Sequence, residues 1–277
     1  MTIKKFQHII WQHYEQFGRD LPWRRTHDPY RILVSEIMLQ QTQVSRVLKK
    51  YPEFLRAFPN FSVLSRAPLL RVLKVWQGMG YNRRAIALKK IAQIVMHKYR
   101  GRLPRDPEAL ARMPGIGRHT AGSIAAFAFN VPAIFIETNI RRTFIHHFFP
   151  RGKSVADAEI ETLAVKTLDL TRPREWYFAL MDYGAHLAHT VPNANRKSAH
   201  YKTQSKFEGS NRQMRGVIIK MLITHGTMNA HQIMESMRKH GNWPTFRLDS
   251  NARVIQILTA LIKEGFIKKH GSLYRLR

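Results

Sequence analysis

The stretch Leu110-Ala-Arg-Met-Pro-Gly-Ile-Gly-Arg-His-Thr-Ala-Gly122 decides the fold of this chain. Its pattern predicts the end of one helix, a tight turn over residues 114–117 and a second helix that starts near His119. The proline fixes one backbone angle of the turn, and Gly115 and Gly117 accept positive φ without a Cβ penalty. The turn leaves backbone N–H groups free at the start of the second helix. With the helix dipole, these groups form an anion site suited to a phosphate.

The chain on both sides of this hairpin is helical almost throughout. Apolar residues recur at helical spacing, and short loops with Pro, Gly or Asn separate the periodic segments. The periodic segments before residue 200 are 3–17, 29–51, 63–67, 69–77, 83–99, 107–112, 118–129, 137–148, 155–169 and 174–187. Alternating runs of β-branched residues are scarce in this part. The sequence therefore predicts an all-α fold here.

The last part of the chain has a different pattern. Residues 188–211 are polar, basic and poorly periodic, which is typical of a linker. Three predicted helices then follow, over 212–225, 229–240 and 249–265, and a hairpin turns at His270-Gly271. This order predicts a winged helix-turn-helix, with the third helix as recognition element and the hairpin as wing. A protein-docking module is the alternative, but the excess of Lys and Arg favours contact with DNA.

The composition narrows the possible partners. The chain has 277 residues, a formal net charge of +28 and a hydrophobic fraction of 44%. Such an excess of positive charge favours a polyanionic partner, with nucleic acid as first candidate. No apolar run approaches the length of a membrane span, and the first residues enter an amphipathic pattern directly. We therefore expect a cytoplasmic, nucleoid-associated protein without membrane contact.

Six segments, one of which is the hairpin, occur in order along the chain. They are Arg19-Asp-Leu-Pro-Trp-Arg-Arg25, Val34-Ser-Glu-Ile-Met-Leu-Gln-Gln-Thr-Gln-Val44, Trp76-Gln-Gly-Met-Gly-Tyr-Asn-Arg-Arg-Ala85, the hairpin at 110–122, Glu137-Thr-Asn-Ile-Arg-Arg142 and Leu180-Met-Asp-Tyr-Gly-Ala185. Together they resemble the MutY-type adenine mismatch glycosylases of the helix-hairpin-helix DNA glycosylase superfamily. They resemble the thymine-DNA mismatch glycosylases slightly less closely. The resemblance covers about residues 4–188.

The resemblance implies a domain organisation. It predicts two helical subdomains with the active-site cleft between them, within a catalytic domain over residues 1–190. The six-helix part covers about 25–135, and the second helical part combines 1–24 and 136–190. A basic linker over 191–211 and the winged helix-turn-helix over 212–277 follow. The resemblance also implies a monomer.

The chemistry of base removal requires few groups. An acid must protonate the leaving base, negative charge must lie near the cationic sugar, and a water must be placed. By resemblance, Glu36 is the general acid, and its apolar neighbours at 37–39 predict a desolvated carboxyl group with a raised pKa. The second carboxylate of the family is an Asp, whose place Glu137 takes here. The extra methylene indicates either a functional variant with a reshaped pocket, which we favour, or weakened activity.

His119 is the third residue that the resemblance places in the catalytic set. Relatives that also cut the DNA strand carry a catalytic Lys at this position of the hairpin. Imidazole is a poor Schiff-base former, so no true AP-lyase activity is expected. His119 either contacts the flipped nucleotide, tunes Glu137, or is a solvated side chain beside a phosphate.

The resemblance also assigns residues that bind the target base and the DNA. Extrusion of a base leaves a gap that a wedge must fill, and Gln41 and Tyr81 are the wedge candidates. Phe178 stands where a polar Glu or Gln normally reads the base. The predicted base-pocket residues are Arg19, Leu21, Trp23 and Phe178. The predicted contacts to the DNA backbone are Gly115, Gly117, Arg118, Thr120, Arg196 and Lys197.

Two features of the family are missing from this sequence. The family usually holds a four-iron cluster on four cysteines, but this chain has no cysteine, and the matching positions carry Ala188, Asn195, Ser198 and Gln204. We therefore expect no iron–sulfur cluster and no other metal centre, apart from a monovalent cation that bridges the hairpin to a phosphate. The nudix-like C-terminal domain that checks for 8-oxoguanine is replaced by the winged helix-turn-helix.

These observations predict a monofunctional DNA glycosylase of base-excision repair. Its predicted substrate is double-stranded DNA with adenine mispaired with 8-oxoguanine or guanine. One alternative keeps the mechanism but removes thymine, uracil or another damaged base opposite guanine. Phe178, Glu137 and His119 favour that alternative. A second alternative is a DNA-binding protein without catalytic activity.

Overall fold

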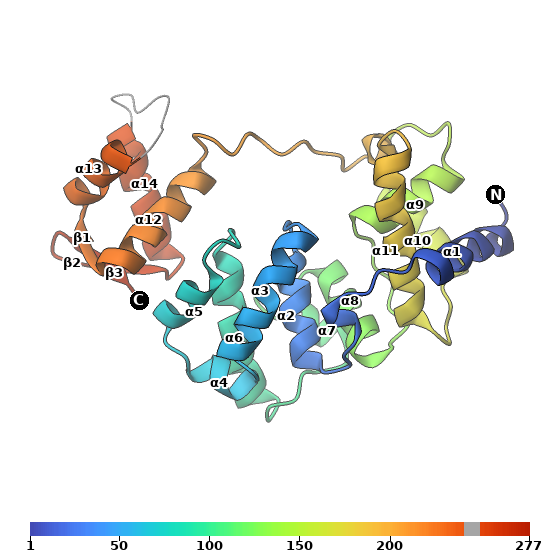
Figure 1. Ribbon diagram of the computed structural model, residues 1–277, viewed down its shortest axis with the longest axis horizontal. Coiled ribbons are helices and arrows are strands. Elements are labelled where there is room, and N and C mark those ends of the chain that lie inside the picture. Colours follow the sequence, from blue (N-terminus) through green and yellow to red (C-terminus); the bar gives the residue numbers. More distant parts are fainter. Residues whose placement is uncertain (241–249) are drawn as a thin grey trace. The chain divides into compact units, whose positions relative to one another are not determined.

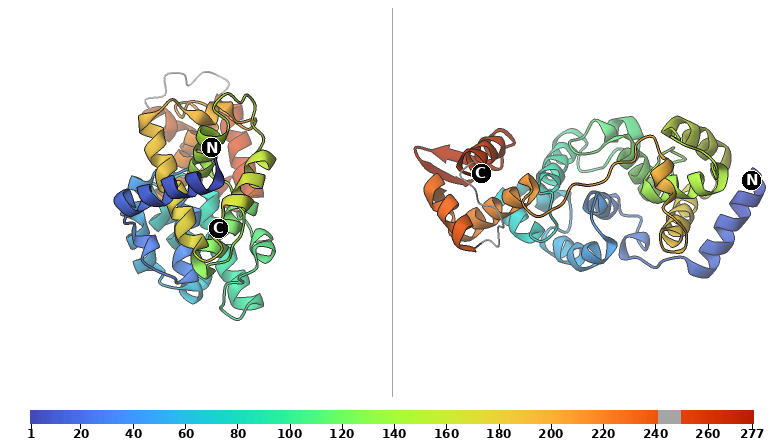
Figure 2. Two further views of the ribbon diagram at one scale, coloured as in Figure 1. Left: turned by 90° about the vertical axis from the view of Figure 1, so that its right-hand side faces the viewer. Right: turned by 90° about the horizontal axis from the view of Figure 1, so that it is seen from above.

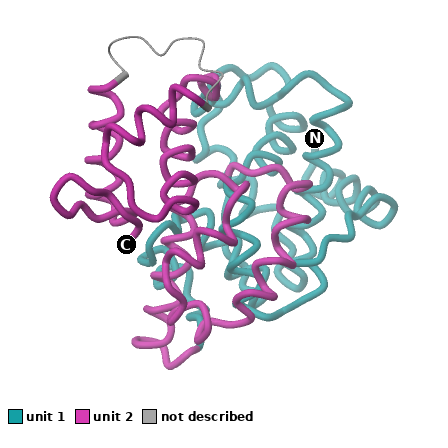
Figure 3. Tube along the Cα trace, turned by 60° about the vertical axis from the view of Figure 1, so that its left-hand side comes forward, with its two compact units in different colours: residues 1–40, 102–203 teal, residues 41–101, 204–277 magenta. Residues whose placement is uncertain are grey.

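The computed structural model describes residues 1–240 and 250–277. These residues form two compact units, each built from two separate stretches of the chain (Figures 1 and 3). The first unit contains residues 1–40 and 102–203, and the second contains 41–101 and 204–277. Each unit is described below by itself.

The first unit is all helical apart from one isolated β-bridge. Its helices are α1 (Ile3–Phe17), α2 (Pro29–Leu39), α7 (Pro107–Ala111), α8 (Arg118–Phe129), α9 (Thr138–Phe148), α10 (Asp157–Thr167) and α11 (Pro173–Thr190), with short 3-10 helices at Pro22–Arg24 and Ala194–Lys197. Asp28 and Asp106 cap the first turns of α2 and α7, and each is followed by a proline at the first helical position. The bridge joins Val155 to Ser198.

One aromatic core holds the first unit together. Phe6 of α1 lies against Phe144 of α9, with ring centroids 5.2 Å apart, and Phe135 lies 3.9 Å from Tyr177 of α11. The same core contains Ile32 of α2, together with Ala126, Phe127 and Ala128 of α8. Thus α2 and α8 share a core with α1, α9 and α11. The two compact units meet along the chain at 40/41, 101/102 and 203/204.

The second unit joins a helical part to a winged helix-turn-helix. Its elements are α3 (Val44–Ala57), α4 (Phe61–Arg66), α5 (Leu69–Trp76), α6 (Arg83–Lys98), α12 (Asn211–His225), β1 (Thr227–Asn229), α13 (Ala230–His240), α14 (Ser250–Lys263), β2 (Ile267–His270) and β3 (Leu273–Leu276). The three strands form one antiparallel sheet in the order β1-β3-β2. Figure 2 shows the hairpin β2–β3, coloured red, beside α14.

The helical pattern and the wing of the sequence analysis are confirmed, with two corrections. The segment 29–51 is not one helix, because the chain leaves helical geometry between Leu39 and Val44, where Gln41 adopts φ +52°. Strand β1 was not predicted. Asp249, the predicted start of the third tail helix, lies outside the described residues. Within the described ranges, no helix combines the length and the apolar character that a membrane span needs.

Candidate active site

Glu36 lies on α2, one turn before the end of that helix. Its neighbours Ser35 and Ile37 are buried, and the Glu36 side chain itself is half-buried. The hydroxyl of Ser123 on α8 donates a hydrogen bond of 2.6 Å to Glu36 Oε2. The packing of α2 against α8 therefore brings a single hydroxyl donor to this carboxyl group.

The Glu36 carboxyl group is poised to hold a proton near neutral pH. Burial raises its pKa from 4.5 to about 7, and the negative charge of Glu137 adds to this rise. The hydrogen bond from Ser123 and the charge of Arg24 act in the opposite direction but do not outweigh burial. A carboxylic acid that stays protonated at neutral pH can donate its proton to a leaving group. The predicted desolvation of Glu36 is thus present in the structure.

Ser123 was not singled out from the sequence, although it is a polar residue within the small and apolar run Ala121-Gly-Ser-Ile-Ala-Ala126. Its hydroxyl lies within hydrogen-bond distance of both Glu36 Oε2 and the carbonyl oxygen of Thr120, at 2.6 and 3.0 Å. A hydroxyl carries one proton, so it donates to one of these oxygens at a time. A bond to the ionised carboxylate favours the ionised form.

Removal of this hydroxyl is expected to shift the pH dependence of catalysis. In Ser123→Ala the ionised form of Glu36 loses its donor, so the pKa rises further. The alkaline limb of the rate profile then moves up by about one pH unit. Single-turnover rates across pH 5–10 measure the shift. Ser35→Ala is the matched control, because the Ser35 hydroxyl is also buried on α2 but donates to the carbonyl of Ile32. An unchanged profile in Ser123→Ala would contradict this prediction.

Glu137 is the N-cap of α9, and its carboxylate is held by N–H donors. Oε1 accepts hydrogen bonds from the backbone N–H of Asn139 (2.7 Å) and of Ile140 (2.8 Å), and Oε2 accepts one from the Asn139 side chain (3.2 Å). Burial raises the pKa of Glu137 above its usual value, and these bonds and the charges of Arg142 and Arg141 offset only part of that rise. Three donors face Glu137 and one faces Glu36. Glu137 is therefore the better candidate for the ionised member of the pair.

Asn139, which braces this cap, is itself fixed by Arg142 and by a glycine on α11. The Arg142 guanidinium donates to Asn139 Oδ1 (2.8 Å) and to the carbonyl oxygen of Gly184 (2.7 Å). A Cβ atom on Gly184 would lie only 2.2 Å from the Asn139 carbonyl oxygen. The absence of a side chain at Gly184 thus permits the close approach of α11 to the start of α9, where Glu137 is positioned.

Gly184→Ala is therefore expected to destabilise the protein and to displace Glu137. The added methyl group meets backbone atoms, so α9 or α11 must shift, at a cost of about 1–3 kcal/mol. Thermal unfolding measures the loss. Gly216→Ala on α12 is the control, because a Cβ atom there meets nothing within 4 Å. Equal melting temperatures for the two variants would show that the approach at Gly184 is not tight.

His119 lies at the start of α8, half-buried and next to the strand-like segment that leads to Glu137. Its Nδ1 accepts a hydrogen bond of 3.1 Å from the backbone N–H of Ile136. Burial lowers the pKa of His119. Because Nδ1 acts as an acceptor, the ring is neutral with its proton on Nε2. The imidazole thus holds the segment before Glu137 in place. Of the three predicted roles of His119, the tuning of Glu137 agrees best with this contact.

Arg19 and Arg24 both bind Asp182 of α11. Asp182 Oδ1 accepts from Arg19 Nε (2.5 Å) and from Arg24 Nη2 (2.7 Å), while Oδ2 accepts from the Arg19 backbone N–H and from Arg24 Nη1. Burial alone would raise the pKa of Asp182, but the bonds and charges of the two arginines lower it overall. Arg141, by contrast, pairs with Asp157.

The remaining base-pocket candidates are largely buried. Leu21 and Trp23 have exposed fractions of only 8% and 6%. The Phe178 ring lies against the Phe127 ring, with centroids 4.6 Å apart, and against the Arg24 guanidinium, 4.4 Å from the ring centroid. Because Phe178 is only 5% exposed, it is not available for stacking on a base. Phe178 therefore packs against the Arg24 guanidinium and does not replace the base contact of the missing Glu or Gln.

The predicted turn is present, but only one of its two glycines uses positive φ. Gly115 adopts φ +77°, whereas Gly117, the N-cap of α8, has φ −89° and makes no side-chain bond to the first turn. The side chain of Gln40 donates to the Gly115 carbonyl oxygen and to the Thr120 hydroxyl, each over 3.2 Å, and links the hairpin to the end of α2. Arg118 is exposed and pairs with Glu161 at 3.3 Å. The backbone amide groups at the start of α8 thus lie beside the end of α2, the helix that carries Glu36.

The side chains of residues 188–204, where the family holds its iron–sulfur cluster, do not fit such a cluster. Asn195 is buried and donates from its side chain to the Thr138 carbonyl oxygen at 3.0 Å. Ser198 is buried and belongs to a β-bridge with Val155, in which Val155 bonds to Lys197 and Ala199 through backbone groups. Amide and hydroxyl hydrogen bonds hold this segment, which carries no thiolate. Residues 191–199 are thus packed against the first unit, although the whole range 191–211 was predicted to be a linker.

The two basic residues of this segment behave differently from each other. Arg196 is exposed, in agreement with a contact to the DNA backbone. Lys197 donates from its ammonium group to the carbonyl oxygens of Pro150 (2.5 Å) and Phe149 (3.4 Å), just after α9. Lys197 therefore binds carbonyl groups of the chain itself at a place where the sequence predicted a phosphate.

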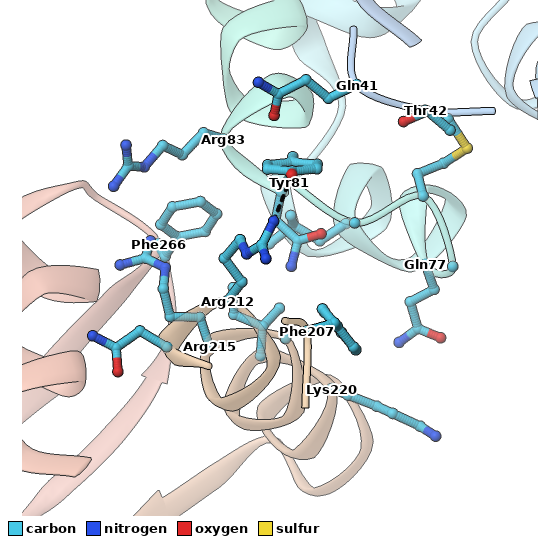
Figure 4. Close-up of a pocket in the computed structure, with 18 of the residues that line it drawn as sticks. Gln41, Thr42, Gln77, Tyr81, Arg83, Phe207, Arg212, Arg215, Lys220 and Phe266 are labelled. Atoms are coloured by element: carbon cyan, nitrogen blue, oxygen red, sulfur yellow. Dashed lines mark hydrogen bonds between the residues drawn. The ribbon is translucent and has the colours of Figure 1, made fainter. Parts of the chain in front are cut away.

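The two wedge candidates lie in the second unit and line the same groove (Figure 4). Gln41 has φ +52° and Tyr81 has φ +45°, a backbone region that bulky residues rarely adopt. The Tyr81 ring is exposed to 37%. Its hydroxyl accepts hydrogen bonds from Gln204 and, at 3.0 Å, from Arg212. Neither Gln204 nor Arg212 was predicted to contact Tyr81, because nothing in their spacing connects them to it.

The helix-hairpin-helix at 107–129 and the carboxyl pair beside it define a class of DNA repair protein. Residues 34–167 match the family described as "HhH-GPD superfamily base excision DNA repair protein", and this chain belongs to that superfamily.

Several relatives carry a more particular name. An adenine DNA glycosylase of Buchnera aphidicola subsp. Baizongia pistaciae is 38% identical over 190 residues, which are 67% of this chain and 53% of that protein. An adenine DNA glycosylase of Mycolicibacterium smegmatis is 32% identical over 241 residues, which are 80% of this chain and 81% of that protein. The matched part thus spans about half of the Buchnera relative.

Solved structures agree on the fold. The structure of a thermostable thymine-DNA glycosylase has a TM-score of 0.61 and 27% identity, and covers 70% of this chain and 91% of its own. A non-covalent endonuclease III–DNA complex has a TM-score of 0.59 at 20% identity, with coverage of 69% and 90%. The predicted helix-hairpin-helix glycosylase fold is confirmed.

Proposed function

We propose that this protein is a monofunctional adenine DNA glycosylase of base-excision repair. In the proposed reaction it hydrolyses the N-glycosidic bond of adenine mispaired with 8-oxoguanine or guanine, and leaves an abasic site in double-stranded DNA. The observation that carries this proposal is the carboxyl pair, with Glu36 protonated near neutral pH and Glu137 fixed by three N–H donors. The names of the most similar relatives support the choice of adenine.

The two carboxyl groups have different tasks in this reaction. The C1′–N9 bond breaks, its electron pair moves into the base, and Glu36 supplies a proton to a ring nitrogen of adenine. A positive charge develops on the sugar, and the ionised Glu137 stabilises it. Water then adds to C1′, and the proton that it loses returns to Glu36. In this scheme the acid is regenerated and the balance is that of a hydrolysis.

No Schiff-base step belongs to the proposal. A lyase step needs an amine that attacks C1′, and His119 stands at the hairpin position in question with Nδ1 engaged by Ile136. The proposed enzyme works as a monomer on nucleoid DNA and without an iron–sulfur cluster. Its hairpin amides around Gly115 and Gly117 bind a phosphate, with a monovalent cation as bridge.

A panel of duplexes tests the proposal. The target pairs are A:8-oxoguanine, A:G, T:G, U:G and hypoxanthine opposite each base, each read with and without hot alkali. Strand cleavage at A:8-oxoguanine and A:G that depends on alkali is the expected result, because alkali cuts the abasic site that a monofunctional enzyme leaves. Cleavage without alkali would overturn the monofunctional assignment.

A second candidate reaction is removal of thymine or uracil opposite guanine. The likeness to the thymine-DNA glycosylase structure favours it, together with Phe178 in place of a polar reader of the base. Release of T or U alone in the same panel would select this candidate. Binding without release of any base would instead select a DNA-binding protein without catalytic activity.

A further inference from the structure

The groove that contains Gln41 and Tyr81 is built from both parts of the second unit. One wall comes from the start of α3 and from the loop 77–82 before α6, and the other comes from α12 and the segment before it. Its volume of about 1320 Å³ exceeds the roughly 300–1,000 Å³ of a small-molecule pocket. The groove therefore suits an extended ligand.

The groove is strongly basic. Among the lining residues that the structure describes, five carry a cationic side chain and none is an Asp or a Glu: the cations are Arg46, Arg83, Arg212, Arg215 and Lys220. Glu264 lies next to the groove and binds two of them, with distances of 2.8 and 2.9 Å to Arg83 and of 3.0 and 2.5 Å to Arg215. These two pairs join α6 to α12 and fix the walls. The charges of Arg46, Arg212 and Lys220 remain to attract an anion.

Tyr81 stands at the centre of this arrangement with its backbone in a strained conformation. The glycines on its N-terminal side, Gly78 and Gly80, also adopt positive φ. Figure 4 shows Arg212 reaching the Tyr81 hydroxyl, where it donates over 3.0 Å. Arg212 Nη2 also donates to the Ser205 carbonyl oxygen at 2.7 Å. An arginine has five N–H donors, so Arg212 can keep both bonds and still donate from its other N–H groups to the edge of a base. Strain at a bulky, exposed aromatic residue points to a binding function.

We propose that this groove binds the DNA strand opposite the excised base, and that Arg212 reads the unpaired base beside Tyr81. Lys220 and Arg46 then bind the phosphates of that strand. The inference rests on the proposed glycosylase action, because extrusion of one base leaves its partner unpaired. In this proposal, residues 204–277 select the opposite base through Gln204 and α12, and not only through α14, the predicted recognition helix.

A guanidinium group suits this task because it recognises the O6 and N7 acceptors of a guanine with two parallel bonds. In 8-oxoguanine N7 carries a proton, so the acceptors that remain for the guanidinium on this edge are O6 and O8. The Tyr81 ring offers an apolar face on which the same base can stack. The side-chain amide of Gln204 donates to the Tyr81 hydroxyl, so its carbonyl oxygen can accept from an N–H of the base. A purine with acceptors on its major-groove edge is thus the favoured partner.

Binding without turnover tests the inference. Fluorescence anisotropy is measured for duplexes with a non-hydrolysable abasic analogue opposite G, A, C or T, at several KCl concentrations. Wild type is expected to bind the G duplex most tightly. Arg212→Lys keeps the charge but not the two-pronged donor, so the preference for G should fall about tenfold with an unchanged salt slope. Lys220→Ala should weaken all four complexes equally and reduce the salt slope by about 0.9.

Arg56→Ala serves as the matched control, because Arg56 is an exposed arginine on α3 that does not line the groove. Melting temperatures confirm that every variant is folded. Equal preference for G in wild type and Arg212→Lys, or tighter binding after the substitution, would overturn the inference. Because the assay needs no base release, its result is separate from the duplex panel: loss of the proposed activity and loss of this binding site are distinguishable.

Discussion

Glu36→Gln is expected to release adenine about 100- to 10,000-fold more slowly than wild type, which is the usual contribution of a general acid. The amide has the shape of the protonated acid and can still accept a bond from Ser123, but it has no proton to give to the base. Single-turnover excision from an A:8-oxoguanine duplex measures the loss. A rate within tenfold of wild type would assign the proton to another group.

The pH dependence of wild type follows from the same residue. Because the pKa of Glu36 is about 7, the protonated fraction falls as the pH rises above 7, and the excision rate falls with it by about tenfold per pH unit. This alkaline limb should be absent from the residual activity of Glu36→Gln. A wild-type rate that stays constant from pH 7 to 9 would contradict the role of Glu36 as acid.

The melting temperature of Glu36→Gln shows whether this variant is folded. The Glu36 carboxyl ionises near 4.5 in the unfolded chain and near 7 in the folded one. Between these values the unfolded state releases a proton that the folded state retains, so this group reduces the free energy of unfolding as the pH rises through that window. The reduction is complete above pH 7. Glu36→Gln removes it, and the variant should melt at the wild-type temperature or higher at pH 8.

Replacement of Glu137 is expected to have the second largest effect, and two variants separate its two tasks. Glu137→Gln keeps an oxygen that can cap α9 through Asn139 and Ile140 but loses the negative charge near the sugar. Excision should fall about 100- to 1,000-fold with little change in melting temperature. Glu137→Ala also loses the cap, so it should be less stable by about 0.5–2 kcal/mol.

The excision rates and the melting temperatures of these two variants are interpreted together. A large loss of rate in Glu137→Ala together with a normal rate in Glu137→Gln would mean that Glu137 only positions α9. Equal losses of rate in both, with different melting temperatures, would show that the charge itself acts in catalysis. The added methylene relative to the Asp of the family is then compatible with function, because the cap geometry already places the carboxylate.

The fold could be predicted largely from the sequence, because helical periodicity and turn residues are local signals. The hairpin at 110–122 and the turn at His270-Gly271 were found this way. Glu36 was instead assigned by the resemblance to the family, and its raised pKa was expected from its apolar neighbours. The break between Leu39 and Val44 was missed because no glycine marks the left-handed conformation at Gln41. The sequence across the break also keeps its helical pattern.

Contacts between distant segments were not predictable, because they depend on packing rather than on spacing. Ser123 and Glu36 are separated by most of the six-helix segment, and the partners of Tyr81 come from the tail. Phe178 was placed in the base pocket by its position in the motif. Its burial between Phe127 and Arg24 follows from the packing of α11 against α8, which no single segment reveals.

Residues 191–199, which pack against the first unit, also affect the conditions under which we expect the protein to work. Oxidants that convert guanine to its 8-oxo form also attack thiolates and release iron from exposed clusters. The side chain of Asn195 and the backbone pairs of Val155 with Lys197 and Ala199 contain nothing that these oxidants modify readily. This segment is therefore expected to keep its shape during oxidative stress, when the lesions that the proposed enzyme repairs are most frequent, and without a supply of iron.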